Sequence, residues 1–291
     1  MQKVFVAGAT GYLGQYLVCE LKRQGYWVRA LVRNTGQVNL VTAADDIVVG
    51  QVTEPTTLIN VAEGMDIVIS TVGITRQKDG MTYMDVDYQG NSNLLREAER
   101  SAVQHFVYVS AIDGDKYQDL KIFQAKERFV NELKRSPIAS TVIRPNGYFS
   151  DMCDFLNMAA SGRIYLFGDG KVKINPISGK DLAKFIVSGL SQPQNTLSVG
   201  GPEILSLNEI SQIAAQALNR EIKIKYLPDW IRKATILLAR RLTSQKTYGP
   251  IEFFLTFMGE NHIGQQVGSD RLSDFYQEEA KKLPSRKKKN A

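Results

Sequence analysis

Short apolar runs and longer amphipathic stretches alternate along the first half of the chain. The apolar runs are rich in valine, isoleucine and aromatic residues, and they cover residues 3–7, 27–33, 46–50, 65–71, 105–110 and 140–144. Runs of this length and composition are typical of buried strands. Their regular alternation with helical stretches predicts an α/β fold with a doubly wound parallel sheet.

Four helices are predicted between these strands. They cover about residues 15–21, 53–62, 83–101 and 123–134. Pro55 suits the first turn of the second helix, because proline lacks an N–H that this turn would leave unpaired. The alternation stops at Pro145-Asn146-Gly147, which is typical of a turn.

The second half of the chain is less regular. Ser178 with Asp181, and Ser206 with Glu209, have the three-residue spacing of helix N-caps. A turn at residues 166–171, an alternating strand at residues 222–226 and helices at residues 182–190, 206–218, 230–242 and 251–258 complete the predicted elements. We therefore expect a main domain over residues 1–150, a smaller C-terminal α/β substrate lobe over residues 151–280 interleaved with the main sheet, and a basic disordered tail over residues 281–291.

Composition and charge limit the classes of partner. The chain of 291 residues is 43% hydrophobic and 23% charged, which is ordinary for a soluble protein. Its net charge of +6 comes from the tail, since the rest of the chain carries equal numbers of basic and acidic residues. We therefore expect no nucleic-acid partner, and a weak contact of the tail with an anionic membrane is the alternative. The longest apolar helical candidate, residues 234–239, is far too short to span a membrane.

The few cysteines and histidines predict neither a disulfide scaffold nor a metal site. Cys19 and Cys153 lie far apart, and we expect Cys19 to be a small buried residue of the first helix. His105 and His262 have no companions at metal-ligand spacing. Because Met1 leads directly into the first strand, we expect no signal peptide and a reducing, cytoplasmic location.

A glycine-rich turn follows the first strand. Gly8, Gly11 and Gly14 are spaced three apart and precede the first helix. Such a turn binds a dinucleotide pyrophosphate, because its glycines permit the tight turn, the close approach of phosphate and close helix packing. The helix N-terminus adds unpaired N–H groups. The pyrophosphate-binding residues predicted from this turn are Gly8, Thr10, Gly11, Tyr12, Leu13 and Gly14; a tight turn without ligand is the alternative.

The end of the second strand favours NADP(H) over NAD(H). NAD-specific sites place an acidic residue there, whereas this chain has Val32-Arg33-Asn34-Thr35. Arg33 can pair with a 2′-phosphate and Thr35 can add a hydroxyl group. The alternative is that Arg33 is a solvated surface residue.

Several further motifs occur in order along residues 1–230. After the glycine turn and the second strand come Thr71-Val72-Gly73, Val109-Ser110-Ala111, Lys126 and Ile143-Arg144-Pro145-Asn146-Gly147. Together they resemble the atypical, NmrA-like branch of the short-chain dehydrogenase/reductase superfamily. The resemblance implies an NAD(P)-binding Rossmann fold, with Thr71, Val72 and Gly73 under the adenosine and ribose.

Two more specific resemblances point in different directions. The motifs Phe123-Gln124-Ala125-Lys126, Phe167-Gly168-Asp169-Gly170-Lys171, Pro176-Ile177-Ser178, Asp181-Leu182-Ala183 and Gly200-Gly201-Pro202 resemble divinyl (proto)chlorophyllide reductases, which reduce a tetrapyrrole vinyl group with NADPH. The segment from Ser110 to Tyr117 instead resembles non-catalytic photosystem assembly factors of the same branch.

The superfamily's active-site tyrosine is missing. Typical members use Ser to fix the substrate, Tyr to transfer a proton and Lys to lower the tyrosine pKa and hold the nicotinamide ribose. The resemblance assigns the Ser and Lys roles to Ser110 and Lys126, but the tyrosine position, four residues before Lys126, is Ile122. Isoleucine cannot donate a proton.

Two other tyrosines are candidates for this role. Tyr117 forms a Tyr-x-x-x-Lys pattern with Lys121, although it follows Ser110 too closely for the family register, and a coincidental match is the alternative. Tyr148 follows Asn146-Gly147 on the side where substrate would bind. Lys126 or water could also supply the proton. The alternative to a functional role for Lys126 is that it is a surface lysine on an amphipathic helix.

Residues at the end of the sixth strand form another candidate site. Arg144, Asn146 and Gly147 lie where ligands bind in parallel sheets, and Asn146 is predicted to contact the cofactor; a simple turn is the alternative. We expect Asp181 to stabilise a helix N-terminus and not to act in catalysis. For the helices after Trp230 we favour a buried face packed on the small lobe, with a substrate lid and a basic membrane-surface helix as alternatives.

Two functional hypotheses follow. The first is an NADPH-dependent oxidoreductase that reduces a bulky, apolar, conjugated small molecule, with Lys126, Ser110 and Tyr117 as catalytic candidates. The second is a non-catalytic NADP(H)-binding sensor or assembly factor that acts through a protein partner, for which Ile122 is the main support.

Overall fold

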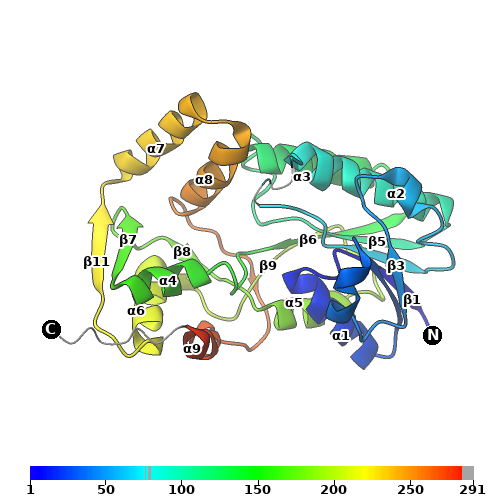
Figure 1. Cartoon of the computed structure of the whole chain (residues 1–291), viewed down its shortest axis with the longest axis horizontal. Helices are drawn as coiled ribbons and strands as arrows, with labels where there is room; N and C mark the ends of the chain where they lie inside the picture. The colour runs from blue at the N-terminus through cyan, green and yellow to red at the C-terminus, as the bar shows by residue number, and fades with distance from the viewer. Residues whose placement is uncertain (76, 78–79, 284–291) are drawn as a thin grey trace.

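A parallel sheet forms the centre of the molecule (Figure 1). The computed structural model describes residues 1–283 apart from residues 76, 78 and 79. Within that range the sheet has the order β12-β9-β6-β5-β4-β1-β2-β3, and every neighbouring pair is parallel. Its strands are β1 (Lys3–Ala7), β2 (Trp27–Val32), β3 (Asp46–Val49), β4 (Ile67–Ser70), β5 (His105–Val109), β6 (Ala139–Pro145), β9 (Thr196–Gly200) and β12 (Gln265–Gln266). The predicted doubly wound α/β fold is confirmed.

Helices cover both faces of this sheet. One face packs against α1 (Tyr12–Arg23) and α5 (Gly179–Ser188), and the other against α2 (Asn91–Arg100) and α3 (Lys121–Leu133). Strand β1 shows why: Val4 and Val6 enter the core beside α1 and α5, whereas Phe5 enters the core beside α2 and α3. A strand buried on both faces must be apolar at every position, so these runs are continuous and not alternating.

The C-terminal lobe lies beside the main sheet (Figure 1). It contains two small sheets, in which β7 (Arg163–Phe167) pairs in parallel with β11 (Lys223–Leu227) and β8 (Lys173–Ile174) pairs in antiparallel with β10 (Leu205–Ser206). The helices α4 (Cys153–Ser161), α6 (Leu207–Ala217) and α9 (Leu272–Lys282) contribute to its apolar core. The helices α7 (Asp229–Leu242) and α8 (Gln245–Phe257) form a hairpin that projects above the lobe in Figure 1.

Several predicted elements need correction. Residues 53–62 form only a short 3₁₀ turn, η2 (Pro55–Leu58), because the backbone turns extended at Ile59, where ψ is 125°, and left-handed at Asn60, where φ is 63°. The helix predicted from residue 83 begins with a wide π-helical segment, η3 (Met84–Gly90). The strand β9 and the helices α4 and α9 were not predicted, and β9 and β12 extend the main sheet with residues from the second half of the chain.

The predictions for Cys19 and for the helices α7 and α8 are wrong. Cys19 is exposed, because α1 turns Leu17, Val18 and Leu21 toward the core and leaves Cys19 on the opposite side. In α7, which the structure describes completely, Arg232 is the one buried residue, so this helix has no buried apolar face. The helix α8 packs instead through Phe253 and Phe257 on Phe123 of α3.

The first two residues assigned to the predicted tail belong to a helix. Lys281 and Lys282 belong to α9 and form ion pairs one turn back with Glu278 and Glu279. Residues 284–291, which hold the other four basic residues of the tail, lie outside the described residues. Among the described helices, none combines the length and apolar character needed to cross a membrane.

Candidate active site at the carboxyl edge of the sheet

The glycine turn between β1 and α1 has little room for side chains. Gly8 has a φ of 79°, and a Cβ there would lie 2.5 Å from Thr71 Oγ1. A Cβ at Gly14 would lie 2.1 Å from the Gly8 carbonyl oxygen, because α1 packs directly on the turn. The Gly11 N–H donates a 3.0 Å hydrogen bond to the same carbonyl and closes the turn.

The N-terminus of α1 is suited to an anion. Its N-cap is Gly11, which has no side chain to accept the first N–H groups, and the first turn contains no acidic residue. The partial positive charge of the helix end is therefore not neutralised by α1 itself. Backbone N–H groups of this kind bind phosphate.

The side chain of Tyr12 has another role. Its hydroxyl oxygen accepts a 3.1 Å hydrogen bond from the Gly179 N–H, and its ring packs against Tyr16 and Tyr148. Burial raises the pKa of Tyr12 to about 12, although the Gly179 N–H opposes this rise. Tyr12 thus joins α1 to α5, and only its backbone N–H remains for the predicted pyrophosphate contact.

Arg33 lies at the end of β2, on the surface. Its backbone N–H donates to Gln37 Oε1 at 3.0 Å, which fixes the start of η1 (Thr35–Leu40). The Arg33 side chain is exposed and has no ion-pair partner among the described residues. An unpaired guanidinium group at this position is available to an anionic ligand.

The segment after β4 connects the glycine turn to the helices on the other face. Thr71 Oγ1 lies 3.3 Å from the Ala7 carbonyl oxygen and 3.2 Å from the Gly8 carbonyl oxygen, as a donor shared between them. Val72 is buried, whereas Gly73 lies over a buried ion pair: a Cβ at Gly73 would be 2.7 Å from both Asp87 Oδ1 and Lys126 Nζ. A larger residue at position 73 would displace this pair.

The ion pair under Gly73 joins Lys126 of α3 to Asp87 of η3. Lys126 Nζ lies 2.7 Å from Asp87 Oδ1, and both side chains are nearly inaccessible to solvent. Burial would lower the pKa of the Lys126 ammonium group, but the charges of Asp87 and the nearby Tyr108 outweigh it and raise that pKa well above its ordinary value. Contact with the Asp87 carboxylate therefore favours the ammonium form of Lys126.

Ser110 lies at the end of β5, close to the same edge. Its backbone N–H donates to the Ile143 carbonyl oxygen at 2.7 Å. Its hydroxyl group is buried and has no hydrogen-bond partner among the described residues. A buried, unpaired hydroxyl group costs stability, so such groups are commonly satisfied by a ligand or water.

The tyrosine position of the superfamily belongs to the core. Ile122 is buried beside Phe123 and Tyr83 in an apolar cluster. Tyr117 lies before α3, as expected, but its hydroxyl donates a 2.6 Å hydrogen bond to Glu260 Oε2. Burial, followed by the charge of Glu260, raises the pKa of Tyr117. Tyr117 is therefore committed to the segment after α8.

Two other tyrosines lie near Lys126. Tyr148 packs on Tyr12 beside the glycine turn; burial raises its pKa, and the Lys126 charge opposes this rise. Tyr108 lies under Lys126, with its ring centroid 5.8 Å from Nζ. Tyr148 was a candidate from the sequence, but Asp87 and Tyr108 were not identified. An acidic residue within an otherwise helical pattern and a tyrosine within an apolar strand carry no distinctive local signal.

The residues at the end of β6 are occupied within the protein. Arg144 pairs with Glu127 at 2.6 Å and also with Asp115. The Asn146 side-chain NH₂ donates to Asn175 Oδ1 at 2.8 Å and to the His262 carbonyl oxygen at 2.7 Å. Arg144 thus joins β6 to α3 and to the loop after β5. The Asn146 side chain joins the main sheet to the lobe, in place of the ligand contact predicted for it.

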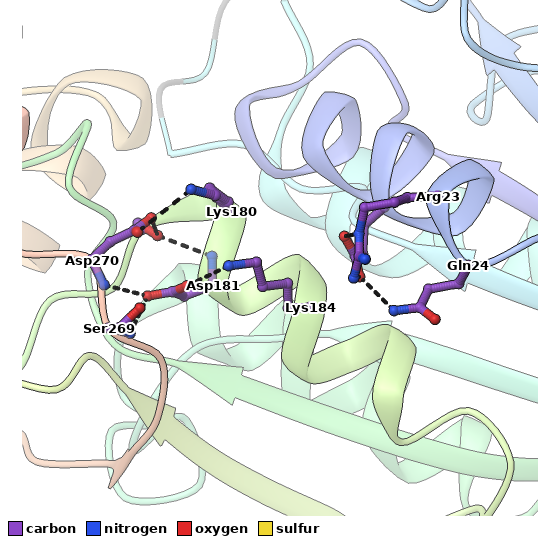
Figure 2. Close-up of polar contacts among 9 residues, drawn as sticks. Arg23, Gln24, Lys180, Asp181, Lys184, Ser269 and Asp270 are labelled. Atoms are coloured by element: carbon purple, nitrogen blue, oxygen red, sulfur yellow. Dashed lines mark hydrogen bonds and ion pairs between the residues drawn. The ribbon is translucent and has the colours of Figure 1, made fainter.

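Asp181 stabilises a helix N-terminus, as predicted, and also holds a distant segment. Figure 2 shows it on α5, next to Lys184 and facing Ser269 and Asp270. The N–H groups of Ser269 and Asp270 each donate a 2.7 Å hydrogen bond to Asp181 Oδ2. Ser178 accepts the Asp181 N–H and donates to Asp270 Oδ2. This cluster is structural.

The features at the carboxyl edge fit a dinucleotide. An uncapped helix N-terminus suits its pyrophosphate, an exposed arginine suits an added phosphate, and a fixed cation with an unpaired serine hydroxyl suits ribose or substrate oxygens. All of them follow β1, β2, β4 or β5 or lie on α3, so the topology of the sheet brings them to one edge.

Comparison with known proteins agrees with this geometry. Residues 8–193 match the family model described as NAD(P)H-binding. The divinyl chlorophyllide a 8-vinyl-reductase of Zea mays is 31% identical over 80% of this chain, which spans 63% of that relative's length. The photosystem II assembly factor Ycf39 of Trieres chinensis is 25% identical, over 79% of this chain and 73% of the relative.

Solved structures support the fold. The structure of AtPrR2 with NADP+ and (+)pinoresinol superimposes with a TM-score of 0.77 at 18% identity, over 95% of this chain and 98% of the other. At this identity the likeness concerns the fold, which includes both the main sheet and the C-terminal lobe.

Proposed function

The chain belongs to the NAD(P)H-binding family, and from this premise we propose that it is an NADPH-dependent reductase of a bulky, apolar, conjugated small molecule. The backbone around the glycine turn binds the pyrophosphate, through Gly8, Thr10, Gly11, Tyr12, Leu13 and Gly14. Arg33 pairs with the 2′-phosphate, and Thr71, Val72 and Gly73 lie along the adenosine and ribose.

The buried Lys126–Asp87 pair under Gly73 carries this proposal. A cation that is shielded from solvent and kept charged by its own carboxylate is costly, and such groups concentrate at functional sites. When bound, NADPH supplies the hydride. Lys126 holds the ribose hydroxyl groups, and the Ser110 hydroxyl orients a polar group of the substrate.

Reduction of an alkene also needs a proton at the second carbon. We assign its delivery to Tyr148 in preference to Tyr117, because the Tyr117 hydroxyl already donates to Glu260. The Lys126 charge acts on Tyr148 and favours loss of its proton. Ile122 then has only a packing role.

A divinyl tetrapyrrole is the substrate that we propose first. The maize relative is named for the 8-vinyl group of divinyl chlorophyllide a. A cytoplasmic location also remains a proposal; the same relative is described as chloroplastic.

The test begins with cofactor binding and continues to turnover. Calorimetric titration is expected to give tighter binding of NADPH than of NADH, with the difference lost in Arg33→Ala. With divinyl chlorophyllide a, NADPH absorbance should fall while the tetrapyrrole gains two hydrogens by mass. Lys126→Met and Tyr148→Phe should lower kcat by about 10²- to 10⁴-fold, and Tyr117→Phe, the matched control, should change it little.

A non-catalytic NADP(H)-binding assembly factor is the second candidate. It is favoured by the core position of Ile122 and by the Ycf39 relative, which is named as an assembly factor. NADPH binding without turnover, together with a protein partner whose binding depends on Arg33 but survives Lys126→Met, would support it. No binding of any dinucleotide would contradict both candidates.

A further inference from the structure

Helix α7 packs with its polar side inward. The Arg232 guanidinium group is buried; it donates to Asp229 Oδ1 at 2.6 Å and to the Leu255 carbonyl oxygen of α8 at 3.0 Å. Two turns later Arg240 pairs with Glu252, which is buried in α8. The hairpin is therefore held together by charged side chains.

The apolar side of α7 is left in solvent. Trp230 is 68% exposed and Leu242 is 76% exposed, and Leu237 and Leu238 are about half exposed. Their helical spacing places all four within one stripe along the helix. A surface helix of a globular protein normally turns this stripe toward the core, so the inverted arrangement indicates a partner.

Basic side chains surround this stripe. Residues 220–246 contain eight basic and two acidic residues. One of the two acids, Asp229, is already paired with Arg232 and Lys233. Lys233 and Arg241 of α7 are exposed next to the apolar stripe.

The same charge continues onto the strands that precede α7. In the β7–β11 pair, Lys223 lies opposite Arg163 and Lys225 lies opposite Tyr165. These four residues share one face of the ribbon, because side chains two apart in a strand point the same way, and all four are exposed. Basic and aromatic residues are thus also exposed on the β7–β11 ribbon, and β7 is in contact with α7.

We propose that this surface, the exposed side of α7 with the outer face of β7 and β11, docks the protein on an anionic lipid bilayer. Leucine and tryptophan enter the boundary between headgroups and acyl chains, while lysine and arginine contact the lipid phosphates. A bilayer accepts such a single convex helix without a matching groove. A second copy of this chain would bring like charges together.

The position of the surface agrees with a peripheral role. In Figure 1, α7 lies at the edge of the molecule, with α8 between it and α3. Its residues are separate from the glycine turn, Lys126 and Ser110. Docking can therefore be tested without changing the proposed cofactor site.

Vesicle sedimentation tests the proposal directly. The full chain should sediment with vesicles of phosphatidylcholine and phosphatidylglycerol, but not with vesicles of phosphatidylcholine alone. Lys233→Gln with Arg241→Gln should weaken binding about fivefold for each residue, and Leu237→Gln with Leu242→Gln about tenfold for each. Lys134→Gln with Arg135→Gln, and Leu40→Gln with Ile59→Gln, remove the same numbers of exposed charges or apolar side chains elsewhere and should have no effect.

A fluorescence measurement locates the contact. In the Trp27→Phe variant the emission reports Trp230, the other tryptophan of the chain, and it should shift to shorter wavelength on anionic vesicles. The proposal would be overturned if the chain did not sediment with anionic vesicles. It would also be overturned if deletion of residues 284–291 abolished vesicle binding while the α7 variants left it unchanged. Two other results without vesicle binding would also overturn it. A higher KM for an apolar substrate in the leucine variants would indicate that α7 contacts substrate. Loss of an acidic protein partner in these variants would indicate that α7 binds protein.

Discussion

Single residues around the glycine turn have little freedom to change. Gly8 and Gly25 both have a φ near 80°, but only Gly8 has a neighbour in the direction of a Cβ, namely Thr71. Substitution of Gly25 therefore measures the cost of backbone strain alone, whereas substitution of Gly8 adds the cost of a close contact with Thr71.

Gly8→Ala should lower both stability and NADPH affinity, whereas Gly25→Ala should lower stability alone. Both variants force alanine into a left-handed conformation, but Gly8→Ala also drives a methyl group into Thr71, which costs about 1–3 kcal/mol more. Urea unfolding and NADPH titration measure the two effects. Equal losses of stability in the two variants would contradict the close approach.

Asp87→Asn should destabilise the fold by about 3–5 kcal/mol, because it leaves the Lys126 charge buried without a partner. Burial would then meet much less opposition and lower the pKa of Lys126, so the alkaline limb of the pH–rate profile should move to lower pH. Asp85→Asn, an exposed acid on the same segment, is the control. If the alkaline limb were unchanged in Asp87→Asn, Asp87 would not be the residue that positions Lys126 and sets its pKa.

Asp113→Asn should reduce stability at neutral pH and have less effect in acid. Asp113 lies 2.5 Å from Lys116 Nζ and 2.8 Å from His262 Nδ1. Burial would raise the pKa of Asp113, but these two partners outweigh it and hold the pKa below the ordinary value of 3.8. The stabilisation is therefore present above pH 3.8 and is lost as the pH falls through the lower folded pKa.

Urea unfolding of wild type and Asp113→Asn over a series of pH values measures this difference. Asparagine tolerates the left-handed φ of 55° at position 113, so the substitution changes the charge without new backbone strain. Asp119→Asn, an exposed acid in the same loop, is the control. If the difference in unfolding free energy between wild type and Asp113→Asn grew as the pH fell, the ion pairs of Asp113 would not be the source of its stabilisation.

Whole elements depend on a few contacts from distant segments. The N-terminus of α5 binds the segment before α9 through Asp181 (Figure 2). The helix α8 packs on α3 through aromatic rings. Contacts with another element also set the orientation of α7. Arg232 and Arg240 bind α8, and these contacts, not the apolar periodicity of α7, decide which side of the helix faces inward.

Asp181→Ala should release the segment at Ser269 and Asp270 from α5. The variant loses two hydrogen bonds to a carboxylate and the charge at a helix N-terminus, which together contribute about 2–4 kcal/mol. Faster amide hydrogen exchange at residues 269 and 270 would report the release. Asp274→Ala, an exposed acid in the first turn of α9, should leave that exchange unchanged.

The main sheet and the lobe share strands and buried polar ties. The strand β9 belongs to the main sheet although it lies in the second half of the chain, and Asn175 joins Asn146, Gly201 and Gly264 across the junction. Because Asn175 is fully buried, none of these groups can be satisfied by water without opening the junction.

We therefore expect the chain to unfold in one cooperative transition. NADPH at one hundred times its Kd should raise the free energy of unfolding by about 2.7 kcal/mol and move the whole transition together. Differential scanning calorimetry measures both. Two separate transitions, of which NADPH moved only one, would contradict the coupling of lobe and sheet.

The sequence by itself determined the features that depend on neighbouring residues. Short apolar runs predicted the six strands up to residue 144, and the glycine spacing predicted a turn with no room for side chains. The capping box of Ser206 and Glu209 is also confirmed. These features have local causes: backbone sterics, turn chemistry and the burial pattern of one element.

Only the tertiary structure decided which distant residues meet. Lys126 was a candidate from its position, but its partner Asp87 lies in a helical segment where an acid normally faces solvent. The Tyr117 hydroxyl donates a hydrogen bond to Glu260, a residue far along the chain. The exposed leucines of α7 were expected to be buried, because periodicity identifies an apolar face without saying what covers it. Long-range packing decides those partners, and no local pattern encodes it.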